Sequence, residues 1–338
     1  MLGAYFQAEK QILKKEIIKN FLLIFLSNGT IKIKKTNMTE LKEPRLAIPI
    51  VLVAGLFWSF GPYVVRHIDE AQTVPWQYLF TRGIIIFILL NVYLYFEEGF
   101  EFINNYKKIG VSGIIGGIGL GSAMMTFIWS ITNTSAAVTL LCLAAMPFVT
   151  ALLGFLFLKE KISTSVWITI AIATVGIIIM ALENNIKSSL LGLMFGLLSS
   201  IGFAVFSVSL RWRKETPKFT TVAIAGIFCA ITSGIIISIN DLNFLSTGKN
   251  EALFATHGTI VCIGLILYSI GSKHIPAAEL TLLSLTEVVG GVFWVWIPWL
   301  GINEVPSTNT IIGGFFIFIS IFYYSLIIQN NKRFIGLN

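Results

Sequence analysis

The chain has 338 residues, of which 55% are hydrophobic and 12% are charged, and its mean hydropathy is +0.82. Soluble globular domains carry about 25% charged residues, so the composition excludes an ordinary water-soluble domain. Apolar runs such as 167–182 do not alternate in polarity, as the strands of a membrane barrel do. We therefore expect an all-α integral membrane protein, because a helix satisfies its own backbone hydrogen bonds in lipid.

The first 45 residues differ in composition from the rest of the chain. They are rich in Lys and Ile, and their apolar run at 21–26 is too short to cross a bilayer. The sequence predicts a basic, disordered cytoplasmic segment at 1–45, or a translation start at Met38. An amphipathic helix lying on the membrane surface is the alternative.

Ten apolar stretches follow, each about long enough to cross a bilayer. They form two sets of five, at 46–66, 76–96, 109–131, 135–158 and 163–182, and at 189–210, 219–239, 252–271, 276–300 and 308–328. The connections between them are too short to hold a soluble enzyme domain, so any function must lie within the helical bundle.

A shift of 141 residues, the difference between Ser59 and Ser200, relates the two sets. It also pairs small residues at the same depth of matching spans: Gly55 with Gly196, Gly61 with Gly202, Gly117 with Gly258, and Ala136-Ala137 with Ala277-Ala278. Because each set has an odd number of spans, the second set enters the membrane from the opposite side. The sequence predicts two inverted five-helix repeats, 46–182 and 189–328, an arrangement typical of secondary transporters.

The net charge of +7 follows the predicted topology. With the N-terminus in the cytoplasm, all but four of the 24 Lys and Arg residues fall on cytoplasmic segments, the four being Arg66, Arg82, Lys187 and Lys249. This asymmetry is the positive-inside rule. We expect a multi-pass protein of the plasma (inner) membrane with both termini cytoplasmic, and the basic charge does not indicate a nucleic-acid partner.

Small residues and prolines indicate how the helices pack and bend. Small residues four apart in spans three and six predict closely packed helices: Gly113, Gly117 and Gly121, and Gly192, Gly196 and Ser200. Pro62 and Pro147 interrupt otherwise continuous helices and predict kinks there.

Glu287 is the most costly polar residue of the predicted spans. It lies about 16 Å along span nine, near the bilayer centre, where an acid costs on the order of 3 kcal/mol. Gly290, Gly291 and Trp294 follow on the same helix face. This pattern indicates a binding or proton-relay site; a protonated carboxyl bonded to a neighbouring helix is the alternative.

Arg82 and His257 are the other polar candidates within spans. Arg82 is expected to point inward, either neutralising a buried acid or holding a substrate carboxylate. His257 is either a packing residue with a hydrogen bond or part of a relay. Inside the spans, Trp58, Trp129 and Trp294 fit the wall of a cavity for a flat or partly apolar solute, although core packing explains each of them as well.

The sequence does not support an enzyme. Its histidines, His67, His257 and His274, lack metal-ligand spacing, and no G-x-S-x-G or phosphate-loop motif is present. We predict no metal, no cofactor and no catalytic residue. The three cysteines lie inside spans without paired spacing, which predicts buried free thiols.

The order of local patterns resembles the EamA-type branch of the drug/metabolite transporter superfamily. The matching residues are Leu56-Phe57-Trp58-Ser59, Val64-Val65-Arg66, Pro75 to Arg82, Ala136-Ala137 with Pro147 and Leu158-Lys159-Glu160, and Ala277-Ala278 with Leu285-Thr286-Glu287-Val288 and Ile302-Asn303-Glu304. The resemblance implies two five-helix repeats around a central cavity and export of small metabolites, often amino acids. It also matches Glu287 to an acid that precedes a proline, which Val288 replaces here, and Glu160 and Glu304 to acids that end spans four and nine.

We therefore expect a ten-helix transporter that moves a small metabolite, an amino acid or related solute, by alternating access around a midplane cavity. Arg82, Glu287 and His257 are its predicted substrate or proton contacts, and Trp58, Trp129 and Trp294 its cavity walls. Its partners are the substrate and membrane lipid, and it acts as a monomer or homodimer. The alternatives are a membrane enzyme or scaffold acting on lipid, and a channel.

Overall fold

The computed structural model describes residues 46–181, 190–213, 215–305 and 308–330, all within one compact unit. Every regular element in these ranges is a helix. In chain order they are α2 (Ala47–Trp58), α3 (Phe60–Arg66), α4 (Pro75–Glu98), η2 (Gly99–Phe102), α5 (Ile103–Lys108), α6 (Gly110–Asn133), α7 (Ala136–Leu143), α8 (Met146–Leu153), η3 (Gly154–Leu158), α9 (Thr164–Ala181), α10 (Leu190–Trp212), α11 (Lys218–Ile239), α12 (Gly248–Gly271), α13 (Ala277–Ser284), α14 (Thr286–Trp296), η4 (Pro298–Leu300) and α15 (Thr308–Asn330). The interpretation of residues 1–45 falls outside these ranges.

The helices match the spans expected from hydropathy to within a few residues. Over the described ranges, eight helical segments are long and apolar enough to cross a membrane, with mean hydropathies from 1.4 to 2.4. The apolar stretches in α9 and α15 are shorter, Thr164–Gly176 and Ile311–Tyr323. Large apolar side chains such as Phe155, Phe157 and Phe315 are exposed on the outside of the bundle, as expected for surfaces that contact lipid. The chain is therefore a multi-pass helical membrane protein.

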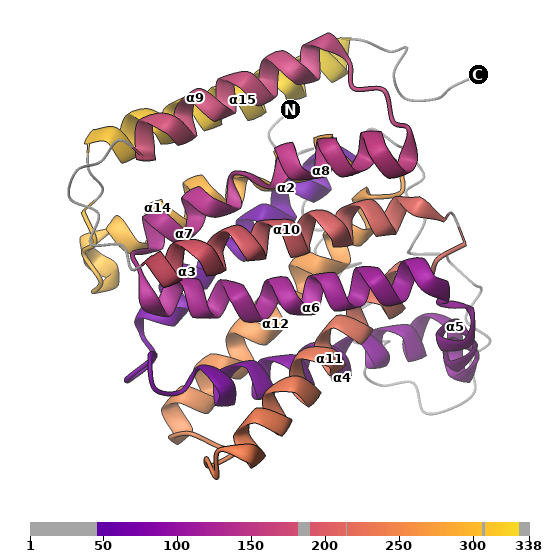
Figure 1. The fold of residues 1–338 in the computed structure, drawn as a ribbon, viewed down its shortest axis with the longest axis vertical. Coiled ribbons are helices and arrows are strands. Elements are labelled where there is room, and N and C mark those ends of the chain that lie inside the picture. The colour runs from indigo at the N-terminus through magenta and orange to yellow at the C-terminus, as the bar shows by residue number, and fades with distance from the viewer. Residues whose placement is uncertain (1–45, 182–189, 214, 306–307, 331–338) are drawn as a thin grey trace, which may run out of the picture. The chain divides into compact units, whose positions relative to one another are not determined.

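Helices from residues 46–181 pack mainly against helices from residues 190–330 (Figure 1). The most extensive contacts join α6 with α10, α4 with α11, α9 with α15, and α2 with α12. In addition, α7 and α8 pack on α10, while α13 and α14 pack on α2 and α3. The core of the protein is thus the interface between the two parts of the chain.

Glycines allow two of these helix pairs to cross at backbone contact. A Cβ atom added at Gly202 of α10 would lie 2.6 Å from the Gly119 oxygen of α6. A Cβ atom added at Gly83 of α4 would lie 2.7 Å from the Gly226 oxygen of α11. Close backbone approach of this kind replaces the hydrophobic driving force that lipid does not supply.

Three of the predicted spans are broken helices. The first breaks at Ser59, three residues before Pro62, and the fourth breaks just before Pro147, between α7 and α8. Both breaks lie where a proline ring displaces the carbonyl one turn earlier. The ninth predicted span also breaks, at Leu285 between α13 and α14, although Val288 stands at the position that matches Pro147 in the fourth.

Hydrogen bonds from side chains stabilise the break at Leu285. Ser284 Oγ donates to the Thr281 oxygen at 2.7 Å, and Thr286 Oγ1 donates to the Leu283 oxygen at 3.2 Å. Thr286 Oγ1 also reaches the Leu52 oxygen of α2, at 3.3 Å. Ser and Thr side chains that bond to backbone carbonyls bend helices, so this break needs no proline.

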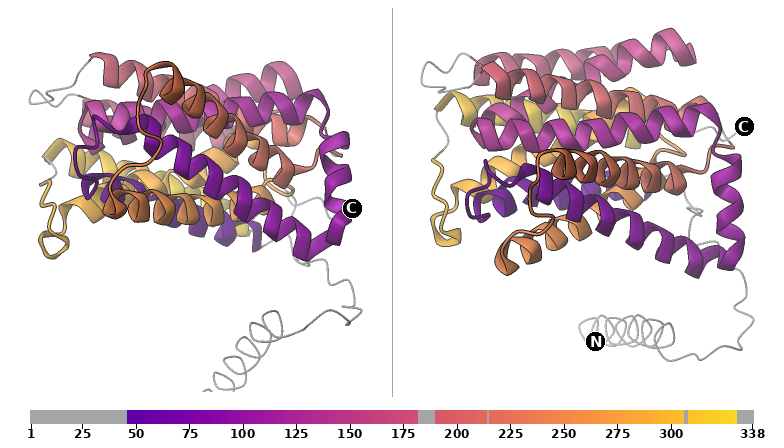
Figure 2. Two further views of the ribbon diagram at one scale, coloured as in Figure 1. Left: turned by 90° about the horizontal axis from the view of Figure 1, so that it is seen from below. Right: turned by 60° about the horizontal axis from the view of Figure 1, so that its bottom comes forward.

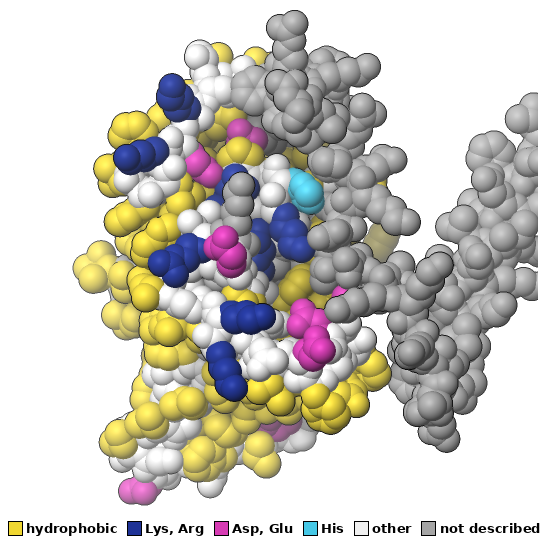
Figure 3. All heavy atoms as spheres, turned by 90° about the vertical axis from the view of Figure 1, so that its right-hand side faces the viewer, with side chains coloured by type: hydrophobic (Ala, Val, Ile, Leu, Met, Phe, Trp, Pro, Cys, Tyr) yellow, Lys and Arg dark blue, Asp and Glu magenta, His cyan; other side chains and the backbone are white. Residues whose placement is uncertain are grey.

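The two ends of the bundle differ in charge. Two further views show the long helices running in one general direction, with α5 turned across one end (Figure 2). Charged side chains gather on this end, and apolar side chains surround them (Figure 3). A hollow of about 900 Å³ at this end is lined by Lys108, Arg211, Lys218 and Lys273, together with Glu98 and Glu215. The three cysteines, Cys142, Cys229 and Cys262, are buried and free, as expected.

Candidate functional site

A narrow cavity lies between the two parts of the chain. Its lining comes from α2, α4, α6, α7, α8, α10, α12 and α14, and its volume is about 60 Å³. One water occupies roughly 10–15 Å³ on this measure, so the cavity holds a few waters. Ligand pockets are typically several times larger, which means that a metabolite enters only if the surrounding helices move apart.

Arg82 brings a buried cation to this cavity. The residue lies two turns into α4 and is 4% exposed, and its Nε and Nη1 atoms have no hydrogen-bond partner. The contact of Gly83 with α11 fixes the rotation of α4, so the guanidinium points inward, as the sequence predicted. A buried guanidinium with free donors is energetically costly unless an anion or water fills the site.

Glu287 lies in the first turn of α14, directly after the break at Leu285, and lines the same cavity. Ion pairs within 4.0 Å in the described ranges join Arg66 to Glu304, Arg211 to Glu160 and Lys249 to Asp69. Arg82 and Glu287 therefore face a common space without pairing with each other. Among the described residues, none donates a hydrogen bond to the Glu287 carboxyl.

His257 of α12 also lines the cavity and is 1% exposed. Its Nδ1 atom is hydrogen-bonded to the Tyr78 hydroxyl, and the Tyr78 ring stacks on Phe254 with centroids 4.7 Å apart. Its other ring nitrogen lies beside Gly61, whose missing side chain leaves space for the imidazole. The histidine is thus held in place by a neighbouring helix while one edge faces the cavity.

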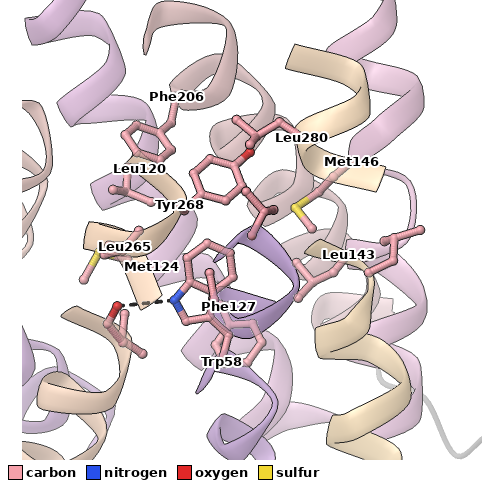
Figure 4. Close-up of a cluster of buried hydrophobic side chains, with 14 of the residues drawn as sticks. Trp58, Leu120, Met124, Phe127, Leu143, Met146, Phe206, Leu265, Tyr268 and Leu280 are labelled. Atoms are coloured by element: carbon pink, nitrogen blue, oxygen red, sulfur yellow. Dashed lines mark hydrogen bonds between the residues drawn. The ribbon is translucent and has the colours of Figure 1, made fainter. Parts of the chain in front are cut away.

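Trp58 forms an aromatic wall of the cavity at the end of α2. Its Nε1 atom donates to the Val261 oxygen at 3.3 Å, the bond drawn in Figure 4, and its ring lies edge-on to Phe203 at 5.4 Å. Gly264 of α12 provides the space for the indole, since an added Cβ there would collide with it. The side chains of Met124, Phe127 and Leu265 lie around the same indole (Figure 4).

Trp129 and Trp294 lie outside the cavity lining. Trp129 packs against Trp76, with ring centroids 5.2 Å apart, and its Nε1 atom has no partner. Trp294 stacks on Phe60 at 4.5 Å and donates from Nε1 to Ser59 Oγ at 2.8 Å, which joins α14 to the break in the first span. The structure thus brings Arg82, Glu287, His257 and Trp58 together, and leaves these two tryptophans between helices.

Sequence reasoning missed most of the apolar lining. Leu120, Met124, Val261, Leu265 and Ser199 all face the cavity, but nothing in their residue types distinguishes them from ordinary span residues. One signal was available. The 141-residue shift pairs Leu120 with Val261, Met124 with Leu265, and Trp58 with Ser199. The predicted wall residue Trp58 therefore pointed to Ser199 through this shift.

The chemistry of the site favours binding. One cation and one carboxyl face a small, otherwise mostly apolar space, and the described ranges contain no group of three His, Cys, Asp or Glu residues that could hold a metal ion. Such a space can recognise a small solute with an anionic group, a cationic group or both.

The comparisons with known proteins agree with this description. Residues 45–182 match the model of the EamA-like transporter family. An uncharacterized transporter of Helicobacter pylori strain J99 is 25% identical over 73% of this chain and 84% of its own length. The pseudopaline exporter CntI of Pseudomonas aeruginosa strain PAO1 is 25% identical over 62% of this chain and 72% of its own length.

Two more distant matches extend over most of the chain. Protein RarD of Salmonella typhi is 21% identical and covers 87% of this chain and all of its own length. A protein of known crystal structure has the same fold, with a TM-score of 0.64 and 17% identity over 85% of this chain and 98% of its own.

The fold is that of a helical membrane protein, and its relatives include proteins named as transporters. Residues 45–182 match the EamA-like transporter family, in agreement with the resemblance predicted from the sequence, and relatives that align over most of the chain include a protein named as a transporter.

Proposed function

We propose that this protein transports a small polar or amphipathic metabolite, an amino acid or related solute, across the plasma (inner) membrane by alternating access. The observation that carries the proposal is the pair of buried, mutually unpaired charges, Arg82 and Glu287, that face one cavity between the two parts of the chain. A transporter needs such a site between two bodies that can rock against each other.

The proposal includes ten spans arranged as two inverted five-helix repeats, 46–182 and 189–328, with α9 and α15 as spans five and ten. The helix contacts support it. Span one (α2) packs on span eight (α12), and span six (α10) packs in the matching way on span three (α6). Spans two and seven pack together, as do spans five and ten. Contacts of this kind are those that a twofold axis between the repeats would generate.

The cavity lining also supports two repeats. The 141-residue shift pairs lining residues from the two parts of the chain: Trp58 with Ser199, Leu120 with Val261, Met124 with Leu265, and Met146 with Glu287. The cavity is then formed by equivalent positions of both repeats, as expected for a site at a repeat interface.

In the proposed site, Arg82 binds an anionic group of the substrate and Glu287 binds a cationic group or carries a proton. Trp58 forms an apolar wall, and His257 supplies a hydrogen bond from the edge of the cavity. Trp129 and Trp294 hold neighbouring helices without touching the substrate, since both lie outside the lining.

The proposed direction is export, with the basic end of the bundle and both termini in the cytoplasm. The cations Lys108, Arg211, Lys218 and Lys273 at one end support this orientation through the positive-inside rule. The pseudopaline exporter among the relatives supports export.

The test begins with metabolite profiles of medium and cytoplasm from cells that overproduce the wild type or Glu287→Gln. A solute enriched in the medium only with the wild type is then measured by uptake into liposomes that contain wild type, Glu287→Gln or Arg82→Ala. We expect transport to fall by about tenfold or more in both variants, because each removes a charge from a desolvated site. Arg213→Gln is the control, since Arg213 is exposed at the end of α10.

Full transport in both Glu287→Gln and Arg82→Ala would remove these residues from the site. Purified wild type that moves no solute but converts a lipid would instead indicate a membrane enzyme. Flux that does not saturate with solute concentration would indicate a channel.

A further inference from the structure

One end of the bundle is held by an arginine at the end of the first span. Arg66, the last residue of α3, forms an ion pair with Glu304 at 3.1 Å. Its guanidinium also donates to the Ile131 oxygen at 3.1 Å and to the Thr134 oxygen at 3.2 Å. The arginine and both carbonyls come from the first part of the chain, and the acid, which follows α14, comes from the second. We name this set the Arg66 clamp.

A second arginine has the same kinds of partner, near the end of α10, and that end of α10 lies at the opposite end of the bundle from α3 (Figure 1). Arg211, near the end of α10, forms an ion pair with Glu160 at 2.8 Å. It also donates to the Ser272 oxygen at 3.2 Å and the Ile275 oxygen at 2.9 Å. Here the arginine and both carbonyls come from the second part of the chain, and the acid, which follows α8, comes from the first. We name this set the Arg211 clamp.

The two clamps use equivalent carbonyls. Ser272 and Ile275 stand 141 positions after Ile131 and Thr134, at the same two points of the connection that precedes the broken span. The arginines are 145 positions apart and the acids, Glu160 and Glu304, are 144 apart. Each therefore departs from the 141 shift by about one helical turn. A constant shift does not align them, although their roles in the structure are the same.

We propose that these two clamps are the gates of the transporter, and that opening toward either side of the membrane requires one of them to break while the other holds. The inference rests on the alternating access proposed above and names the contacts that alternate. In the present structure both clamps are formed, and the cavity between them has room for only a few waters.

The position of each clamp suits this role. Each ion pair joins the two parts of the chain and is less exposed than the Asp69–Lys249 pair, which also joins them, so separation at that end must break it. Each acid also lies just beyond a broken span, α7–α8 or α13–α14, which carries a cavity residue at its break, Met146 or Glu287. Movement of the broken span would therefore act on the clamp and the cavity together.

The clamps are also suited to reversible opening. The side chains of Arg66 and Glu304 are 24% and 37% exposed, and those of Arg211 and Glu160 are 27% and 22% exposed. Water can therefore solvate the charges once they part, so breaking a clamp avoids the large penalty of leaving a fully buried charge alone. With one such contact at each end, the protein has two open states, one toward each side of the membrane. Weakening one contact shifts the equilibrium toward the state that is open at that end.

The test measures access to the cavity from each side of the membrane. The protein is made without its native cysteines, and Ser199→Cys, in the cavity lining, serves as the reporter. A membrane-impermeant maleimide is applied to intact cells and to inside-out vesicles, and the ratio of the two labelling rates is recorded. Glu304→Gln and Glu160→Gln each remove one ionic contact with little change in side-chain shape.

We expect Glu304→Gln and Glu160→Gln to shift the labelling ratio in opposite directions, each by about fivefold or more, the usual range of coupling between states. The variant with both substitutions should return the ratio toward that of the parent. Asp69→Asn is the control, because it removes the exposed ion pair of Asp69 with Lys249, which lies outside both clamps. Its ratio should equal that of the parent.

Shifts in the same direction, or shifts no larger than that of Asp69→Asn, would overturn the proposal. The measurement needs neither a substrate nor net transport. A protein whose labelling ratio responds as expected but which moves no solute would therefore retain its gates and lose the proposed function. The reverse pattern, transport without a change in the ratio, would leave the function and remove the gates.

Discussion

The fourth and ninth spans of this protein have the same shape and different chemistry. Both break at the same relative position, at Ala144–Ala145 and at Leu285, and the first turn of the next helix carries a residue that lines the cavity. In the fourth span that residue is Met146, with Pro147 after it; in the ninth it is Glu287, with Val288 after it. A shared backbone geometry is therefore reached by two different local causes.

The same contrast extends to two other polar cavity residues, Arg82 and His257. The residue 141 positions after Arg82 is Ala223, and the residue 141 positions before His257 is Gly116. Each polar group of the cavity thus has a small or apolar residue at the equivalent position. In the proposed repeats, equivalent backbones form the space, and single differences between them give it polarity, as expected for a site that binds an asymmetric solute.

The largest effect is expected from a proline placed inside the ninth span. Val292→Pro removes a hydrogen bond from the interior of α14 and should cost about 3 kcal/mol or more in the free energy of unfolding. Val288→Pro should cost far less, because residue 288 lies in the first turn and Pro147 already occupies the equivalent position. Unfolding in a detergent titration measures both. Equal losses would show that the two breaks are not equivalent.

The next effect concerns polarity at the break. Glu287→Met gives the ninth span the residue of the fourth, and we expect transport to fall by about tenfold or more while the fold persists. Met146→Leu, a change of similar volume at the equivalent apolar position, should alter stability by less than about 1.5 kcal/mol and leave most transport intact. Liposome uptake, with thermal unfolding as a check, compares them. Similar losses would mean that the two sides of the cavity are not chemically distinct.

The smallest effects involve the equivalent serines of spans one and six. Ser59→Ala leaves the Trp294 Nε1 atom without its acceptor, which should cost about 1–3 kcal/mol. Ser200→Ala frees only the Cys142 and Gly196 carbonyls, and the Cys142 oxygen still accepts from the Ala145 nitrogen. We expect a loss of about 1 kcal/mol or less there. Thermal unfolding in one detergent ranks the two variants, and the opposite ranking would contradict these bond assignments.

The helical membrane fold could be predicted from the sequence, because lipid restricts both composition and backbone. Span boundaries followed from hydropathy, and the breaks near Pro62 and Pro147 followed from the missing amide hydrogen. The break at Leu285 could not be predicted in this way. It depends on Ser284 and Thr286 side chains that bond to carbonyls, including one on α2, and such contacts require the tertiary structure.

The charged part of the candidate site was also accessible from the sequence. Arg82 and Glu287 stand out because a charged residue inside a membrane span is energetically costly and is therefore found there mainly at functional sites. The roles of the tryptophans could not be predicted from the sequence. Trp58 and Trp294 are the same residue type inside spans, and only the rotation of each helix points Trp58 into the cavity and Trp294 toward Ser59. The clamps were missed for a different reason. In the sequence, Arg211 carries only a topology signal, Arg66 adds a match to the family pattern, and Glu160 and Glu304 are acids at span ends.

The pairing of α9 with α15 has a consequence for how the chain is made. The two helices meet where the Gly176 backbone lies against that of Gly313, and α15 supplies most of the contacts of α9. Residues 164–181 leave the ribosome more than a hundred residues before their partner does. During that interval the face of α9 around Gly176 lacks its partner helix. This layer therefore assembles only after α15 has been made, and a truncation that removes α15 would disturb a helix made much earlier.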